Sequence, residues 1–240
     1  RAPPVALRLA GDVADLVAGV RPDVVVHTAY SRTDHAATVS VAESVAAACA
    51  AAAVALVHVS TDALFDGEHP PYSEDDDPTP VHDYGRAKAA AEVAVRAAVP
   101  DVAVVRTSLI LAPDGSDSTS AWAVDRLRAG ERITCFEDEV RCPILVEDLA
   151  RQIWEVVERP RAERAGAWHL VGPERLSRFE IGRRLAERLG LDPQLVDAAP
   201  SPTTGEPRPR DVTLTSRRAA LLTWRARPIG SVAAHGDGIG

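Results

Sequence analysis

Apolar residues along the chain alternate between short unbroken runs and longer stretches with helical spacing. Mainly apolar runs predict strands at residues 5–9, 24–26, 55–60 and 102–107, and the unbroken run at 24–26 is typical of a strand that is buried on both faces. The stretches that follow the first three runs predict helices at about residues 13–20, 36–53 and 84–98. Strands that alternate with helices are typical of an α/β fold with a doubly wound parallel sheet.

This rhythm changes after Leu111. A loop at 112–116 precedes predicted helices at 120–129 and 146–158 and predicted strands at 132–136 and 167–171. Ser177 and Glu180 have the spacing of a capping box, which predicts that a helix begins there. Residues 200–209 are rich in proline and indicate a linker or loop, and 211–215 is a candidate strand. We therefore expect a core at 1–111, a smaller α/β lobe at 112–234 that is partly interleaved with the core, and a disordered tail at 235–240.

Composition excludes several functional classes. The net charge of −8 argues against a surface for nucleic acid or anionic membranes, and no apolar run reaches the ~18–20 residues of a membrane span. No signal peptide is visible. Cys49, Cys135 and Cys142 are odd in number and lack the spacing of metal ligands, so we expect a reduced, cytoplasmic protein without a metal site.

Tyr84 and Lys88 are the clearest candidates for chemistry. Four residues apart on a helix, they lie one turn from each other, and a nearby ammonium lowers the pKa of a phenol. Such a tyrosine acts as a general acid or base. Lys88 is also the only lysine among 27 basic residues, which indicates a need for its compact ammonium.

Polar residues stand where the predicted strands end. Thr28, Thr61 and Ser108 follow three of these strands, and ligands of such sheets bind beyond the carboxyl ends of the strands. Thr61 and Asp62 have a second interpretation, in which they only tighten the loop after the strand. The pairing with Tyr84 and Lys88 favours catalysis.

Several ordered segments together resemble the extended short-chain dehydrogenases. Within them, the chain is most similar to the dTDP-4-dehydrorhamnose reductase branch, the RmlD-like sugar-nucleotide-binding family. The likeness covers about residues 7–224 and rests on the segments 22–29, 60–67, 71–75, 84–88, 106–109, 141–150 and 168–173.

The resemblance implies a Rossmann-like dinucleotide-binding core and transfer of hydride from NADPH or NADH to the keto group of a 4-keto-6-deoxy sugar nucleotide. Tyr84 would protonate the carbonyl oxygen, Thr61 would hydrogen-bond it, and Lys88 would lower the pKa of Tyr84 and hold the nicotinamide ribose. The cofactor-binding positions implied are Asp12, Val13, Thr28, Ala29, Tyr30, Val59, Tyr84 and Lys88. Those implied for the substrate are Thr61, Asp62, Leu109 and Arg141. The family also suggests a homodimer.

Other interpretations of individual residues stay open. Asp12 is equally suited to be a helix N-cap. His27 and His58 lie in apolar strands, which favours a place in the core over metal binding. Arg141 either binds a phosphate or pairs with Glu137 or Glu139. The acidic run at 74–77 indicates a solvated loop.

One family feature is missing from these 240 residues. Dinucleotide-binding folds have a Gly-rich turn after their first strand, and no Gly-x-x-Gly-x-x-Gly occurs here, as though the front of the chain had been lost. We expect a sheet with an open slot and weak or absent cofactor binding in this form. Micromolar affinity in a titration with NADPH and NADH would contradict this.

The neighbouring residues narrow the reaction. Ala63 follows Asp62 where related dehydratases have a glutamate, so dehydration is disfavoured. Epimerisation at C4 remains an alternative. A second alternative is a non-catalytic NAD(P)-binding relative that regulates another enzyme.

Overall fold

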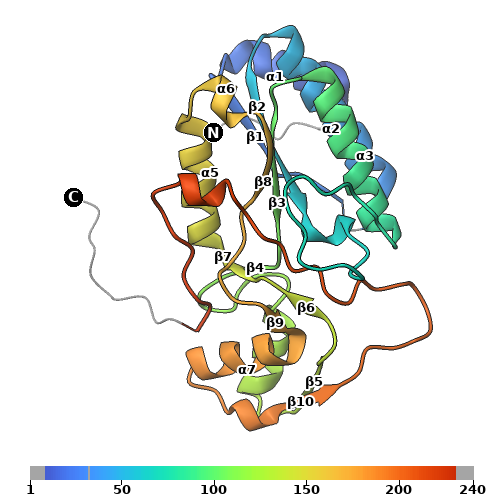
Figure 1. Cartoon of the computed structure of the whole chain (residues 1–240), viewed down its shortest axis with the longest axis vertical. Coiled ribbons are helices and arrows are strands. Elements are labelled where there is room, and N and C mark those ends of the chain that lie inside the picture. The colour runs from blue at the N-terminus through green and yellow to red at the C-terminus, as the bar shows by residue number, and fades with distance from the viewer. Residues whose placement is uncertain (1–8, 32, 231–240) are drawn as a thin grey trace.

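The computed structural model describes residues 9–31 and 33–230, and its main layer is a parallel sheet. Four strands pair in the order β1-β2-β3-β8, as Figure 1 shows. Their bounds are Val24–His27, Ala55–Thr61, Ala103–Thr107 and Gly166–His169. The prediction of an α/β fold with a parallel sheet is confirmed. We had expected an open slot in this sheet. Within the described part of the chain the four strands are continuous, and β1 lies at one edge.

Helices cover both faces of the sheet because side chains alternate along each strand. Leu56 of β2 packs into a core with α1 (Ala10–Val20), α2 (His35–Ala51) and α3 (Asp83–Ala98). Its neighbour Val57 faces the other way, toward a core that includes α5 (Val146–Glu158). Figure 1 shows α5 on one side of the sheet and α2 and α3 on the other.

A smaller lobe lies beyond the carboxyl ends of the strands (Figure 1). In it β5 pairs in parallel with β10, β6 pairs antiparallel with β9, and α4 and α7 pack nearby. α5 and β8 belong to the sheet layers, although elements of the lobe both precede and follow them in the sequence. The two parts therefore interleave. The lobe and its connections comprise β4 (Ile110–Leu111), α4 (Ala121–Arg128), β5 (Ile133–Phe136), β6 (Val140–Arg141), β7 (Ile144–Leu145), β9 (Leu176–Ser177), α7 (Arg178–Arg188) and β10 (Val196–Ala199). The short helix α6 (Arg161–Arg164) connects α5 to β8 at the other end of the sheet (Figure 1).

The boundaries of several predicted elements differ from the observed ones. α1 begins at Ala10 with Leu9 as its N-cap, so Asp12 lies in the first turn and is not the cap. Residues 211–215 form no strand, because only Asp211 and Leu214 make single bridges, to Val140 and Tyr72. The capping box of Ser177 and Glu180 is present. The predicted strand at 5–9, apart from Leu9, and the tail at 235–240 lie outside the described residues.

The acidic run at 74–77 is not simply a solvated loop. The carboxylate of Glu74 accepts hydrogen bonds from the Ser216 hydroxyl and from the backbone of Arg217 and Arg218. It therefore ties the C-terminal segment to the core. None of the helices in the described ranges is both long and apolar enough to cross a bilayer.

Candidate active site

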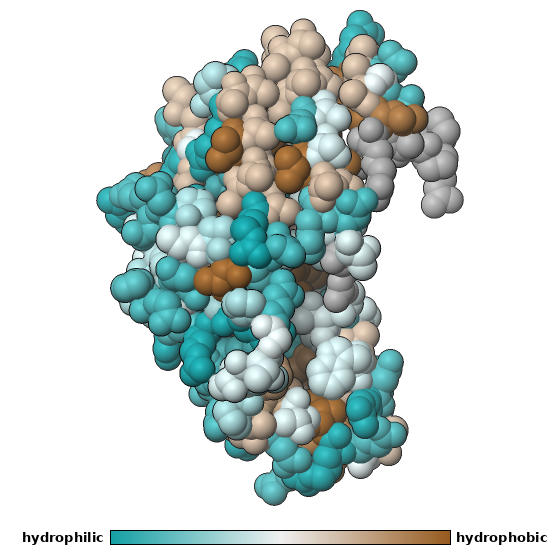
Figure 2. Space-filling model, turned by 90° about the vertical axis from the view of Figure 1, so that its right-hand side faces the viewer, coloured by the Kyte–Doolittle hydropathy of each residue, from teal (hydrophilic) through white to brown (hydrophobic). Residues whose placement is uncertain are grey.

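A cavity of about 710 Å³ opens between the carboxyl ends of the strands and the smaller lobe. In the space-filling view of Figure 2 the surface is hollowed between these two parts. Thr28, Thr61 and Ser108, the three residues that follow β1, end β2 and follow β3, all line it, as expected of a parallel sheet. The other predicted site residues in its wall are Tyr30, Val59, Asp62, Tyr84, Lys88, Leu109 and Arg141.

Three predicted cofactor positions do not line this cavity. Asp12 is exposed on α1, and Val13 is 2% exposed because it packs into the core between the sheet and the helices. Ala29 packs against the same core. The structure thus brings most of the predicted site residues together in one cavity wall and leaves Asp12, Val13 and Ala29 outside it.

Local backbone features place Tyr84 at the cavity wall. The Nδ1 atom of His82 accepts a hydrogen bond from the backbone N–H of Gly85, which caps the first turn of α3. Gly85 lies so close to the Ala63 carbonyl that a Cβ at this position would collide with it. This close approach sets the first turn of α3 against the loop that follows Thr61.

The Tyr84 phenol remains protonated over a wide pH range. Burial is the largest cause and raises its pKa to about 12, although a hydrogen bond with the Thr61 side chain acts in the opposite direction. The charges of Tyr30 and Asp62 raise the pKa further. In the absence of bound molecules, Tyr84 is therefore a proton donor rather than a phenolate.

The predicted effect of Lys88 on Tyr84 is not found. The Lys88 Nζ atom donates a hydrogen bond to the carbonyl oxygen of Val59 at 2.7 Å, and the ammonium is not among the causes that shift the tyrosine pKa. Burial instead lowers the pKa of Lys88 itself, to about 8. Helical spacing correctly placed Tyr84 and Lys88 on one helix. It could not reveal that the Val59 carbonyl of the neighbouring strand would accept the hydrogen bond from the ammonium.

Asp62 is a second acid in the cavity. Its carboxylate accepts a hydrogen bond from Ser108 Oγ at 2.6 Å and a longer one from Thr61 Oγ1 at 3.3 Å. Burial raises the pKa of this carboxyl, while the charges of Arg141 and Arg178 and the two hydroxyls oppose the shift. The three polar residues at the ends of β2 and β3 therefore form one connected group.

Aromatic rings surround the Tyr84 phenol at the mouth of the cavity. The ring centroids of Tyr30, His82 and His35 lie 5.9, 6.1 and 6.4 Å from that of Tyr84. Tyr30 is half exposed, so one side of this group faces solvent. Tyr30 thus lines the cavity despite its size.

The structure shows Arg141 in a mainly structural position. Its guanidinium donates to the carbonyl oxygens of Val140, Pro209 and Arg210, and Nη2 lies 3.9 Å from Glu139 Oε2. Of the two predicted ion-pair partners, Glu139 is therefore the one observed. Arg141 also lines the cavity, so its charge still acts there.

Sequence reasoning missed part of the cavity wall. Arg178, Asp117–Thr119 and the segment 206–209 line it. Proline content predicted the loop at 200–209 but not its location. No local pattern marks Arg178, which the fold brings to the cavity as the first residue of α7.

The two strand histidines lie in the core. His27 Nδ1 and His58 Nδ1 are 2.9 Å apart and hydrogen-bonded, and the residues are 4% and 1% exposed. Among residues 9–31 and 33–230, no group of three or more His, Cys, Asp or Glu side chains could hold a metal ion.

Comparison with known proteins identifies the family. The family model described as the RmlD substrate binding domain matches residues 4–228. The chain belongs to this family. A dTDP-4-dehydrorhamnose reductase of Mycolicibacterium smegmatis is 35% identical over 237 residues, which cover 88% of this chain and 70% of that protein.

Two further similarities concern the fold and the range of functions of RmlD relatives. The crystal structure of the Bacillus anthracis dTDP-4-dehydrorhamnose reductase in complex with NADP has a TM-score of 0.81 and 23% identity, and the match covers 92% of this chain and 83% of that one. The methionine adenosyltransferase 2 subunit beta of Danio rerio is 29% identical over 225 residues, which cover 88% of this chain and 70% of that protein.

Proposed function

We propose that this RmlD-family chain is an oxidoreductase that uses NADPH or NADH to reduce a 4-keto-6-deoxy sugar nucleotide. The main support is that Tyr84 and Thr61 lie together in the wall of a cavity that is large enough for a sugar, with the Thr61 side chain close enough to act on the pKa of the phenol. The similarity to dTDP-4-dehydrorhamnose reductases supports the same reaction class.

The residues present fit the nicotinamide end of the cofactor. Thr28, Tyr30 and Val59 form one wall next to the buried Lys88. Lys88 donates only to Val59 among the described residues, so its ammonium has N–H groups left for ribose hydroxyls. Ser60 Oγ, also in this wall, is buried without a hydrogen-bond partner. When bound, the cofactor would supply the hydride.

The side chains of this chain would handle the proton. Tyr84, whose pKa of about 12 keeps it protonated, would donate its proton to the carbonyl oxygen as the alcohol forms. The Thr61 hydroxyl would hydrogen-bond the same oxygen and stabilise its developing charge. Asp62 would orient a sugar hydroxyl, and Leu109 would contact the sugar ring, since both line the same cavity.

Replacement of one hydroxyl tests this proposal. In an assay of NADPH oxidation with dTDP-4-dehydrorhamnose, Tyr84→Phe should lower kcat by about 10²-fold or more because the proton donor is removed. Binding of a nucleoside diphosphate should stay within about twofold of the parent chain, since the phenol is the only group lost. Turnover by Tyr84→Phe at the parent rate would contradict the assignment.

A regulatory role is the second candidate. The similarity to a methionine adenosyltransferase beta subunit favours it. In that case the chain would bind cofactor or nucleotide and show no turnover with any 4-keto sugar nucleotide. A C4 epimerase would instead interconvert two sugar nucleotides without net NADPH consumption.

The cytoplasmic location and the homodimer stay predictions. Free Cys49, Cys135 and Cys142 suit a reducing cytoplasm, where NADPH is available. A homodimer would appear in size-exclusion chromatography with light scattering as twice the 25.5 kDa chain mass.

A further inference from the structure

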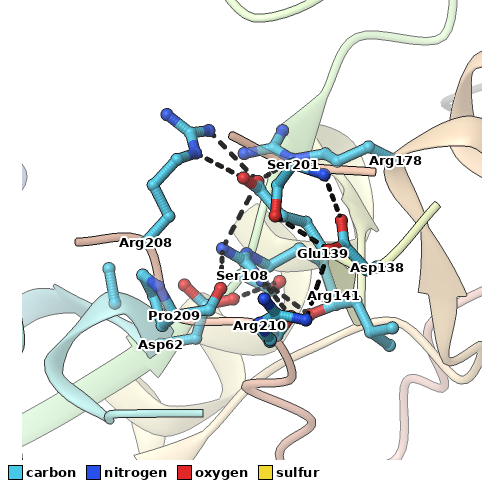
Figure 3. A network of polar contacts seen from close by, with 12 residues as sticks. Asp62, Ser108, Asp138, Glu139, Arg141, Arg178, Ser201, Arg208, Pro209 and Arg210 are labelled. Atoms are coloured by element: carbon cyan, nitrogen blue, oxygen red, sulfur yellow. Dashed lines mark hydrogen bonds and ion pairs between the residues drawn. The ribbon is translucent and has the colours of Figure 1, made fainter. Parts of the chain in front are cut away.

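Three arginines from separate segments meet at the lobe side of the cavity. Arg141 ends β6, Arg178 begins α7 and Arg208 lies in the loop after β10, and all three line the cavity. Figure 3 shows their guanidinium groups around the carboxylate of Glu139. Glu139 is fully buried, and it is hydrogen-bonded to Arg208, with Arg178 Nε at 3.5 Å and Arg141 Nη2 at 3.9 Å.

Three carboxyl groups lie among these three guanidinium groups. Glu139 pairs with Arg208, and Glu206 adds a second negative charge near Arg208. Asp62, whose carboxyl pKa is raised by burial, lies near Arg141 and Arg178. Arg178 itself faces two cations, Arg141 and Arg208, and shares Glu139 with both of them. A partly buried charge of this kind is costly unless an anion binds beside it.

Arg178 is the member with free donors. The Nη groups of Arg141 are engaged by three backbone carbonyls, and Arg208 donates through Nε and Nη2 to Glu139. Among the described residues, the Arg178 side chain makes no hydrogen bond and has only the ionic contact of its Nε with Glu139. Its two Nη groups thus form the fork that matches phosphate oxygens.

The backbone holds Arg178 firmly in place. Its N–H donates to the Glu139 carbonyl oxygen at 2.9 Å, and the preceding residue, Ser177, forms the capping box of α7. β6 and β9 pair directly in front of this point, with Val140 opposite Ser177. These contacts fix the Arg178 backbone, so only the side chain has to be ordered when a ligand binds.

We propose that Arg178 binds the diphosphate of the sugar nucleotide, with Arg208 beside it and Glu139 as their shared counter-ion. This inference rests on the proposed function. In a hexopyranose the anomeric oxygen lies across the ring from C4. A keto group at Tyr84 and Thr61 therefore directs the diphosphate away from them, and Asp62, which follows Thr61, lies within electrostatic reach of Arg178.

Binding measurements with simple ligands test the assignment. Calorimetry compares dTDP with thymidine on the 240-residue chain and on Arg178→Gln. The variant should bind dTDP about 10- to 100-fold more weakly, because charge-assisted hydrogen bonds to phosphate are lost, and thymidine equally well. Arg183→Gln is the matched control, since this α7 arginine is 45% exposed, pairs with Glu187 and does not line the cavity.

Three outcomes would overturn the proposal. These are unchanged dTDP affinity in Arg178→Gln, an equal loss of dTDP and thymidine binding, and no dTDP binding by the parent chain at millimolar concentration. If Arg178→Gln does not fold, Arg178→Lys keeps the charge beside Glu139 and should still lose several-fold in dTDP affinity, because an ammonium lacks the planar fork.

Turnover is measured separately. In an active chain, Arg178→Gln should raise KM for the sugar nucleotide with kcat within about threefold, whereas Tyr84→Phe lowers kcat. If the parent chain binds dTDP through Arg178 but reduces no keto sugar, the proposed reaction fails and the diphosphate subsite stands.

Discussion

At the scale of single residues, the site separates the proton donor from the cation. Burial raises the pKa of Tyr84 and the Thr61 side chain opposes this shift, while Lys88 donates to a strand carbonyl. The two residues share the cavity but do not form a phenol–ammonium pair. Lys88 is thus better suited to binding a ribose than to activating the tyrosine.

The lowered pKa of Lys88 leads to a prediction about pH. Burial sets this pKa at about 8, so the ammonium loses its proton as the pH rises through that value. NADPH affinity, to the extent that the charge of Lys88 contributes to it, should therefore fall between about pH 7 and 9. Fluorescence titration of NADPH across this range measures the fall.

Lys88→Arg distinguishes this residue from other groups that titrate in the same range. A guanidinium does not deprotonate in proteins, so the variant should bind NADPH more weakly at pH 7 but with a flat profile up to pH 9. A variant that keeps the fall would assign it to another group.

At the scale of secondary-structure elements, the first turn of α3 depends on Gly85. A Cβ at this position would collide with the Ala63 carbonyl oxygen and with the His82 ring that caps the helix. Gly85→Ala should therefore lower the free energy of unfolding by about 1–3 kcal/mol, as overpacking typically does. It should also reduce turnover, because Tyr84 is the preceding residue. Urea unfolding and the NADPH assay measure these effects.

Gly19→Ala on α1 is the matched control. A Cβ there meets no atom within 4 Å, and alanine stabilises a helix interior by about 0.5–1 kcal/mol relative to glycine. Opposite signs for the two substitutions are expected. Equal effects would show that the contact with Ala63 does not constrain α3.

Local patterns predicted the elements better than the contacts between them. The apolar runs gave the strands of the sheet, and the capping box gave the start of α7, because both signals lie within a few residues. The extended segment at 211–215 was wrongly considered a strand because pairing depends on partners at Tyr72 and Val140, far away in sequence. Arg178 was missed for the same reason.

At the scale of the whole molecule, the site lies between two parts of the fold. The sheet layer supplies Thr61, Tyr84 and Lys88, and the lobe supplies Arg178 and Arg208. Sequence motifs identified the first group because its members are close in sequence or follow strands. The second group is defined only by how the lobe packs, which no motif encodes.

Stability of the whole molecule should depend on the buried histidine pair. Burial is the main cause that lowers the pKa of His27 to about 4 and that of His58 to about 2, against 6.5 for a free histidine. Below about pH 6.5 the unfolded chain binds protons that the folded chain excludes, so stability falls as the pH drops. From about one pH unit above that value both states are neutral and this dependence disappears. Between pH 6.5 and 5 the two groups together should remove roughly 3 kcal/mol.

Urea unfolding at pH 5.0, 5.5, 6.0 and 6.5 measures this slope. The double variant His27→Leu/His58→Leu should have a flatter profile, because both partners of the hydrogen bond are replaced and no orphaned buried nitrogen remains. Some slope should persist, since burial also lowers the pKa of His169. His69→Gln is the control, because this side chain is 83% exposed and its replacement should leave the profile unchanged. If the double variant kept the full slope, the protons would bind elsewhere, and the pair would serve only to fix the register of β1 against β2.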